Sequence, residues 1–152
     1  MNSEQLHTPL NILLADDDRD DRAFFENALL EISIATHLTT VNDGEQLMEY
    51  LTANKNQLPD IVFLDLSMPR KTGYECLAEI TGDENFTGLY TVMLTTSFTR
   101  GMELEDNLIK TLLNMGAQHY IRKPADFEAL KKVIKDILTI FIEKKNAYRN
   151  TI

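Results

Sequence analysis

The sequence predicts an α/β fold: a doubly wound sheet of five parallel strands with five helices. Two observations carry this prediction. Five short apolar runs alternate along the chain with segments whose apolar residues recur at helical spacing. Polar or turn-forming residues follow most of the apolar runs at once, as is typical where a buried strand ends. Strands and helices that alternate in this way favour a parallel sheet with helices on both faces, joined by right-handed crossovers.

The length and composition fit one folded domain. The chain has 152 residues and is 43% hydrophobic, which is enough for a buried core but leaves no room for a second domain. We expect an N-terminal tail over 1–9, the folded domain over 10–143 and a C-terminal tail over 144–152. We expect the C-terminal tail to be solvated, with an amphipathic extension for dimer contacts as the alternative, and we expect no appended output domain.

Charge and cysteine content exclude several classes of protein. The net charge of −9 argues against a nucleic-acid or anionic-membrane surface, because both need a basic footprint. The single cysteine, Cys76, cannot form an internal disulfide, and the first residues lack the apolar core of a signal peptide. The apolar runs are too short to cross a bilayer. We therefore expect a cytoplasmic protein with no nucleic-acid and no membrane partner.

The first predicted unit is a strand, an acidic loop and a helix. The apolar run 10–15 breaks into the acidic run 16–18, and apolar side chains then recur at helical spacing. Asp18, Asp20 and Asp21 lie at the helix start, where carboxylates cap backbone amides and offset the helix dipole, so we assign them structural roles. The side chains expected to face inward are Ala23, Phe24, Ala28, Leu29 and Ile32.

The middle of the chain repeats the alternation of strand and helix twice. The pattern predicts strands over 37–41 and 60–64, and helices over 45–51 and 74–80. The turn 42–44 carries the Asn-Asp-Gly signal that separates the first of these strands from its helix. The inward side chains expected on the two helices are Leu47, Met48 and Leu51, and then Tyr74, Cys76, Leu77 and Ile80.

The last part of the chain contains two further units. Strands are predicted over 90–94 and 119–122, and helices over about 103–115 and from about residue 126. Gly116 terminates the earlier of these helices. The inward side chains expected are Leu104, Leu108, Ile109, Leu112 and Met115 on the earlier helix, and Leu130, Val133, Ile134, Ile137, Leu138 and Phe141 on the later one.

Polar side chains follow four of the five predicted strands. Asp16 and Asp17 follow the first strand, Asp65 the third, Thr95 the fourth and Lys123 the fifth. Because the carboxyl ends of parallel strands meet at one edge, where ligands of open α/β sheets bind, we expect these side chains to form one site. Taken alone, the acidic run after the first strand would read as a solvated helix start and Asp65 as a turn cap.

The residue types of this site indicate metal-assisted phosphoryl chemistry. Crowded carboxylates repel one another unless a cation neutralises them, and oxygen ligands with retained waters suit Mg²⁺. A backbone carbonyl near Ser67 and a phosphoryl oxygen would complete such a site. With Mg²⁺ and Lys123 holding the phosphoryl oxygens, Asp65 is the candidate in-line nucleophile. The Thr95 hydroxyl can donate a hydrogen bond to the same oxygens.

Four sequence blocks together resemble a known family. They are ILLADDD over 12–18, IVFLDLSMPRKTGYE over 61–75, VMLTTS over 92–97 and HYIRKP over 119–124. In this order and at strand ends, they are similar to the receiver domain of two-component response regulators, of the stand-alone chemotaxis or phytochrome-associated type. The resemblance extends from about residue 10 to residue 141. It implies a flavodoxin-like fold with strand order 2-1-3-4-5.

The resemblance implies a role for each residue of the metal and phosphate site. Asp65 would accept the phosphoryl group from a sensor histidine kinase or a histidine phosphotransfer protein. Asp17 would bind Mg²⁺ directly, Asp16 mostly through water, and the Ser67 carbonyl would complete the metal site. Lys123 would pair with the phosphoryl group. The family is a phosphoacceptor signalling domain rather than an enzyme, although it assists its own Mg²⁺-dependent phosphorylation and dephosphorylation.

The resemblance also implies how the signal leaves the site. Thr95 would be the switch hydroxyl and Tyr120 the switch aromatic, although an aromatic in a short strand is more often a core residue. They would bias a face made by the fourth helix, the fifth strand and the fifth helix, which binds a downstream protein or a second copy of the chain. The Lys123–Pro124 bond resembles the cis peptide of the family, an isomer that the sequence alone leaves open.

One departure from the family pattern stands out. The interval from Thr95 to Lys123 is several residues longer than in compact receivers, and the surplus lies around 98–106. We expect this segment to reshape the signalling face and to select a dedicated partner.

Two other classes of function remain as alternatives. Haloacid dehalogenase-type phosphotransferases also use an Asp after a strand, but they carry a second Asp two residues later, where this chain has Ser67. Their metal-binding acids also follow the lysine, whereas the acidic pair here comes first. The stronger alternative is a receiver-like interaction scaffold that no longer depends on phosphate.

Overall fold

The chain folds around one parallel sheet. A computed structural model describes residues 8–96 and 102–151. Within these residues the sheet has five strands in the order β2-β1-β3-β4-β5, which confirms the predicted order. The elements are β1 (Leu10–Ala15), α1 (Arg19–Leu30), β2 (Thr36–Val41), α2 (Gly44–Ala53), β3 (Ile61–Asp65), α3 (Gly73–Thr81), a short 3₁₀ helix η2 (Glu84–Phe86), β4 (Tyr90–Thr95), α4 (Met102–Asn114), β5 (His119–Arg122) and α5 (Phe127–Thr151).

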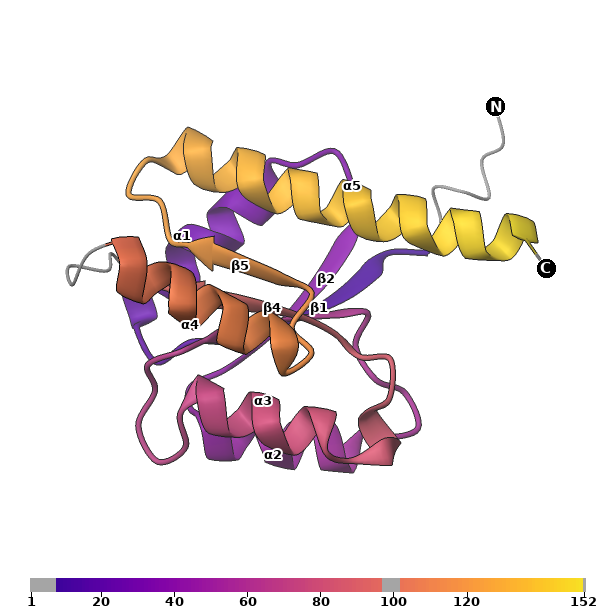
Figure 1. The fold of residues 1–152 in the computed structure, drawn as a ribbon. Helices are drawn as coiled ribbons and strands as arrows, with labels where there is room; N and C mark the ends of the chain where they lie inside the picture. The colour runs from indigo at the N-terminus through magenta and orange to yellow at the C-terminus, as the bar shows by residue number, and fades with distance from the viewer. Residues whose placement is uncertain (1–7, 97–101, 152) are drawn as a thin grey trace.

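Helices cover both faces of the sheet (Figure 1). Side chains from α1 and α5 form the core on one face, and side chains from α2, α3 and α4 form the core on the other. The residues of β1 alternate between the two cores: Ile12 and Leu14 belong to the first, Leu13 and Ala15 to the second. Because both faces of the central strands are buried, their sequences are apolar over most of their length rather than alternating regularly with polar residues.

The predicted strands and helices are all present, but several inward side chains were assigned wrongly. Phe25 is buried on α1, whereas Ala23 is exposed, because the buried stripe of this helix runs through 25, 28 and 29. Tyr74, at the start of α3, is 46% exposed. Leu104 is 50% exposed, and the neighbouring Glu105 is the buried residue of that turn of α4.

Helix α5 is longer than predicted. Residues 144–151, expected as a solvated tail, continue α5 as regular helix, and the end of the helix projects beyond the sheet (Figure 1). Neither Gly nor Pro occurs between 127 and 151, so the sequence has no residue that would stop the helix. The part of the chain that the structure describes includes no helix with the length and apolarity of a membrane span.

Candidate functional site

The predicted site residues lie at the carboxyl edge of the sheet. Asp65 is the last residue of β3 and Thr95 the last of β4, while Asp16 directly follows β1 and Lys123 directly follows β5. The parallel register aligns these strand ends, with Ala15 opposite Leu64 and Thr95 opposite Arg122. Four separate segments of the sequence therefore place their polar side chains in one region.

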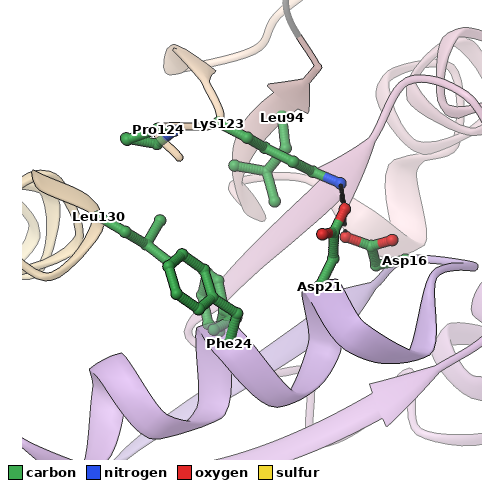
Figure 2. Close-up of a pocket in the computed structure, with 8 residues that line it drawn as sticks. Asp16, Asp21, Phe24, Leu94, Lys123, Pro124 and Leu130 are labelled. Atoms are coloured by element: carbon green, nitrogen blue, oxygen red, sulfur yellow. Dashed lines mark hydrogen bonds and ion pairs between the residues drawn. The ribbon is translucent and has the colours of Figure 1, made fainter. Parts of the chain in front are cut away.

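Lys123 links the carboxylates at this edge. Its ammonium nitrogen Nζ lies 2.7 Å from Asp16 Oδ2, 3.1 Å from Asp65 Oδ2 and 2.9 Å from Asp21 Oδ2. Figure 2 shows the lysine side chain reaching from the end of β5 toward Asp21, on α1, and Asp16. The Lys123 amide donates to the Thr95 carbonyl at 2.7 Å, so the lysine backbone is fixed to the end of β4.

Three carboxylates form a cluster suited to a cation. Asp16, Asp17 and Asp65 each offer an oxygen, and these oxygens lie within 4.8 Å of one another. Asp16 and Asp65 are buried, whereas Asp17 is exposed. Carboxylate oxygens at a partly open site are the ligands that Mg²⁺ prefers, because this ion keeps several waters and uses few protein ligands. The donor set therefore fits the predicted magnesium ion.

Hydrogen bonds hold the acidic loop after β1 in place. The Asp16 carboxylate accepts from the Asp18 amide at 3.0 Å, and the Arg22 guanidinium donates to the Asp16 carbonyl at 2.8 Å. Asp18 caps α1 by accepting from the Asp21 amide at 2.9 Å, the structural role expected for it. The acidic loop is therefore fixed at both of its ends.

The loop after β3 turns sharply around Asp65. The Ser67 amide donates to Asp65 Oδ1 at 3.1 Å, which places Ser67 directly beside the buried carboxylate. A side chain at Gly73 would bring its Cβ within 2.2 Å of the Asp65 carbonyl oxygen, so only glycine permits this close return of the chain. Burial raises the pKa of Asp65 to about 6, even though the positive charge of Lys123 acts in the opposite direction.

For Lys123 the effect of its charged partners on the pKa outweighs the effect of burial. Its burial alone would lower the pKa of Lys123, but the hydrogen bonds to Asp16 and Asp21 and the charge of Asp65 raise it above its usual range. Lys123 therefore stays positively charged at neutral pH. The site contains more carboxylates than cations, so an additional positive charge would bind there favourably.

The two predicted switch residues lie on the neighbouring strands β4 and β5. Thr95 is 9% exposed at the end of β4. The Tyr120 hydroxyl donates to Glu105 Oε2 at 3.0 Å, and burial together with Glu105 raises the pKa of Tyr120 to about 12. Arg122 also binds Glu105, with Nε 3.0 Å from Oε2. Tyr120 is thus connected to α4.

Two residues of this region were missed or misjudged in the sequence. Asp21 was assigned a structural role only, yet its carboxylate binds Lys123. It lies in the first turn of α1, directly after the acidic loop, and this closeness in sequence could have suggested the connection. Glu105 precedes Leu108, Ile109 and Leu112 at helical spacing, which marks it as an inward-facing acid on α4.

The isomer of Lys123–Pro124 differs from the one that the family resemblance suggested. The described residues contain no cis peptide bond, so this bond is trans. Trans is the intrinsically favoured isomer of such bonds. Residues 98–101 of the lengthened segment lie outside the described residues, and from residue 102 the chain is helical as part of α4.

Comparison with known proteins decides the family. The model of the response regulator receiver domain matches residues 12–135. The chain belongs to this family. The response regulator Rcp1 from a Synechocystis strain is 28% identical over 93% of this receiver and 95% of Rcp1. The probable methanogenesis regulatory protein FilR2 from Methanothrix harundinacea is 29% identical over 85% of this receiver and 81% of FilR2.

Solved structures agree with this assignment. The phosphorylated cyanobacterial phytochrome response regulator RcpA superimposes with a TM-score of 0.76 at 30% identity, over 90% of this receiver and 96% of RcpA. The Mn²⁺-bound form of Rcp1 gives a TM-score of 0.71 at 27% identity, over 85% of this receiver and 91% of Rcp1. Receivers are signalling domains of two-component systems that accept a phosphoryl group on an aspartate and bind a divalent ion at their acidic pocket. The dehalogenase-type alternative is therefore set aside.

Proposed function

We propose that Asp65 is the phosphoacceptor of this receiver and takes its phosphoryl group from a sensor histidine kinase or a histidine phosphotransfer protein. One observation carries the proposal: Asp65 is a buried carboxylate in contact with the Lys123 ammonium and clustered with Asp16 and Asp17. A nucleophile, a fixed cation and a set of metal ligands at one sheet edge are the parts that phosphoryl transfer needs.

Asp16, Asp17, Asp65 and the Ser67 carbonyl would hold Mg²⁺. When bound, the ion supplies positive charge that offsets the carboxylates and the oxygens of the phosphoryl group. The exposed position of Asp17 suits a ligand that a hydrated ion reaches first. The hydrogen bond that the Ser67 amide donates to the Asp65 carboxylate keeps the loop in place. The Mn²⁺-bound form of Rcp1 supports the choice of a small divalent ion.

The residues of the chain have distinct tasks in the transfer. An Asp65 oxygen forms a bond to phosphorus while the bond from phosphorus to the donor nitrogen breaks and its electron pair stays on that nitrogen. Lys123, whose ammonium lies 3.1 Å from Asp65 Oδ2, would pair with the incoming phosphoryl oxygens. The Thr95 hydroxyl would donate to the same oxygens. The same groups would assist hydrolysis, in which water takes the phosphoryl group and returns Asp65 to a carboxylate.

The signal would leave the site through β5. Thr95 and Tyr120 would respond to the new phosphoryl group, and the face formed by α4, β5 and α5 would bind a downstream protein or a second copy of the receiver. The hydrogen bond from Tyr120 to Glu105 supports this path, because it connects β5 directly to α4. Phosphate acts here by favouring one of two arrangements of that face.

The test is intact-protein mass spectrometry after incubation with a small phosphodonor, with and without Mg²⁺. We expect a Mg²⁺-dependent phosphoryl adduct on the wild-type protein and none on Asp65→Asn. The matched control is Asp60→Asn, a carboxylate next to the opposite end of β3 that accepts from the Asn11 amide at 2.8 Å. This control should form the adduct at the wild-type level.

Absence of the adduct in the folded wild-type protein, with a donor that phosphorylates another receiver, would contradict the proposal and favour a phosphate-independent interaction scaffold. An adduct that persists in Asp65→Asn would place the phosphoacceptor on another residue. Thermal unfolding of each variant shows whether the fold is intact.

A further inference from the structure

The Lys123 ammonium has three carboxylate partners, and they are not equivalent. A lysine ammonium has three N–H donors, and in the described structure Asp16, Asp21 and Asp65 each lie within hydrogen-bond distance of the nitrogen. Asp16 and Asp65 come from the sheet edge, whereas Asp21 comes from the first turn of α1. The ammonium is therefore held from both the sheet and a helix.

Two of these partners are shared with the metal site and one is not. Asp16 and Asp65 belong to the cluster of acids that could hold a cation, together with Asp17, whereas Asp21 does not belong to it. A bound cation would draw on the Asp16 and Asp65 oxygens and repel the ammonium. Phosphorylation would convert the Asp65 carboxylate to an acyl phosphate. Asp21 is the partner that neither event takes away.

The surroundings of the lysine stem give it little other restraint on one side. A pocket of about 40 Å³ lies beside it, lined on its apolar side by Phe24, Leu94, Pro124 and Leu130 (Figure 2). The stem is therefore not closely packed on that side. The contacts of the ammonium nitrogen itself are those with the three carboxylates.

We propose that Asp21 is a positioning residue for Lys123, which keeps the ammonium beside Asp65 once a divalent cation has engaged Asp16 and Asp65. This inference rests on the proposed function, because it assigns the Asp21 carboxylate a role in the phosphoryl-transfer site. Asp21 itself touches neither the metal nor the phosphoryl group. It acts through Lys123 alone.

The first measurement compares the rate of phosphorylation by a small phosphodonor at saturating Mg²⁺. Asp21→Asn should lower the maximal rate about fivefold, the size expected when a partly exposed ion pair is lost, with little change in the donor concentration at half-maximal rate. The matched control is Asp20→Asn, which removes the same charge from the same exposed helix turn and should leave both quantities unchanged.

A double-mutant cycle separates positioning from a general structural role. In a Lys123→Met background, Asp21→Asn should have no further effect on the phosphorylation rate, because the group through which it acts is absent. An equal loss of rate in both backgrounds would overturn the proposal. So would an Asp21→Asn rate equal to that of Asp20→Asn in the wild-type background.

A second readout needs no phosphorylation. The ¹⁵N NMR signal of the Lys123 ammonium should remain protected from exchange when Mg²⁺ is added to the wild type and to Asp20→Asn, and should lose that protection in Asp21→Asn. Protection that survives in Asp21→Asn would overturn the proposal. A wild-type protein that forms no adduct would contradict Asp65 phosphorylation, and this spectrum would still decide the role of Asp21.

Discussion

Two charged clusters meet at neighbouring residues of the chain, and their charge balance differs. Lys123 binds three carboxylates, from Asp16, Asp21 and Asp65, with Asp17 close by. Arg122, one residue earlier, binds the single carboxylate of Glu105, which also accepts from the Tyr120 hydroxyl. The first cluster has more acids than cations, whereas the second pairs one acid with one cation.

The difference in charge balance corresponds to a difference in how deeply the two cations are buried. The Lys123 side chain is 14% exposed and that of Asp65 only 6%, whereas the Arg122 side chain is 48% exposed. Excess buried negative charge is costly, and the raised pKa of Asp65 expresses that cost. We infer that the first cluster is built to receive positive charge, while the second is complete without a ligand and fastens α4 to β5.

Removing the lysine tests the unbalanced cluster and should have the largest effect. Lys123→Met leaves Asp16 and Asp65 buried with no cation between them, so the free energy of unfolding without Mg²⁺ should fall by about 3 kcal/mol at pH 8. The loss should be smaller at pH 5, because the pKa of Asp65, already near 6, rises further without Lys123 and the carboxyl is then protonated. Urea unfolding at the two pH values measures both quantities.

Arg122→Met is the matched control for this comparison. It removes a half-exposed cation from the neighbouring position, and the buried Glu105 carboxylate still accepts from the Tyr120 hydroxyl, so the cost should be smaller, about 1 kcal/mol. Equal costs for the two variants would show that the clusters do not differ as their burial and charge indicate.

Removing an acid from the same cluster should have the opposite sign. The pKa of Asp65 is about 6 in the folded protein and near 3.8 in the absence of its surroundings. Between these values the folded state holds more protons than the unfolded state, so stability falls as the pH rises from about 4 to 6 and stays lower above 6. Asp65→Asn should therefore stabilise the Mg²⁺-free protein by about 2 kcal/mol at pH 7.

The gain from Asp65→Asn should vanish at about pH 3, below both pKa values, where the wild-type carboxyl is protonated in both states. Asp60→Asn, at an exposed hydrogen bond to Asn11, should show no such gain and serves as the control. A wild-type stability that rises between pH 4 and 6 while that of Asp65→Asn does not would contradict the raised pKa of Asp65.

The sequence predicted the sheet well because its signals are local. Each strand is an apolar run that stops at polar residues, and the order of elements then leaves few topologies. It predicted the phase of some helices badly: Phe25 and not Ala23 is buried on α1, and Glu105 and not Leu104 on α4. Hydropathy alone cannot show that a buried acid such as Glu105 has cationic and phenolic partners on a distant strand.

The site was predicted as a set of residues but not as a network. Strand-end positions led to Asp16, Asp65 and Lys123, and the structure brings these three into contact. The contact between Lys123 and Asp21 depends on where α1 lies over the sheet, which the sequence pattern does not specify. The roles of Thr95, Ser67 and Tyr120 stay predictions, because they concern states with a metal or a phosphoryl group.

The smallest expected effect concerns the balanced cluster. Tyr120→Phe removes one hydrogen bond to Glu105 while Arg122 still neutralises this acid, so stability should fall by only about 1 kcal/mol.

The matched control is Tyr90→Phe, which removes a hydroxyl bound to His119 Nε2 at 2.7 Å near the other end of these strands. Tyr120 contacts Glu105 of α4, whereas Tyr90 packs in the core on the α1 and α5 face of the sheet. Hydrogen exchange of the α4 amides should therefore be faster in Tyr120→Phe and unchanged in Tyr90→Phe. Equal exchange in α4 for both variants would mean that Glu105 fastens this helix through Arg122 alone, and the path proposed from β5 to α4 would then exclude the tyrosine.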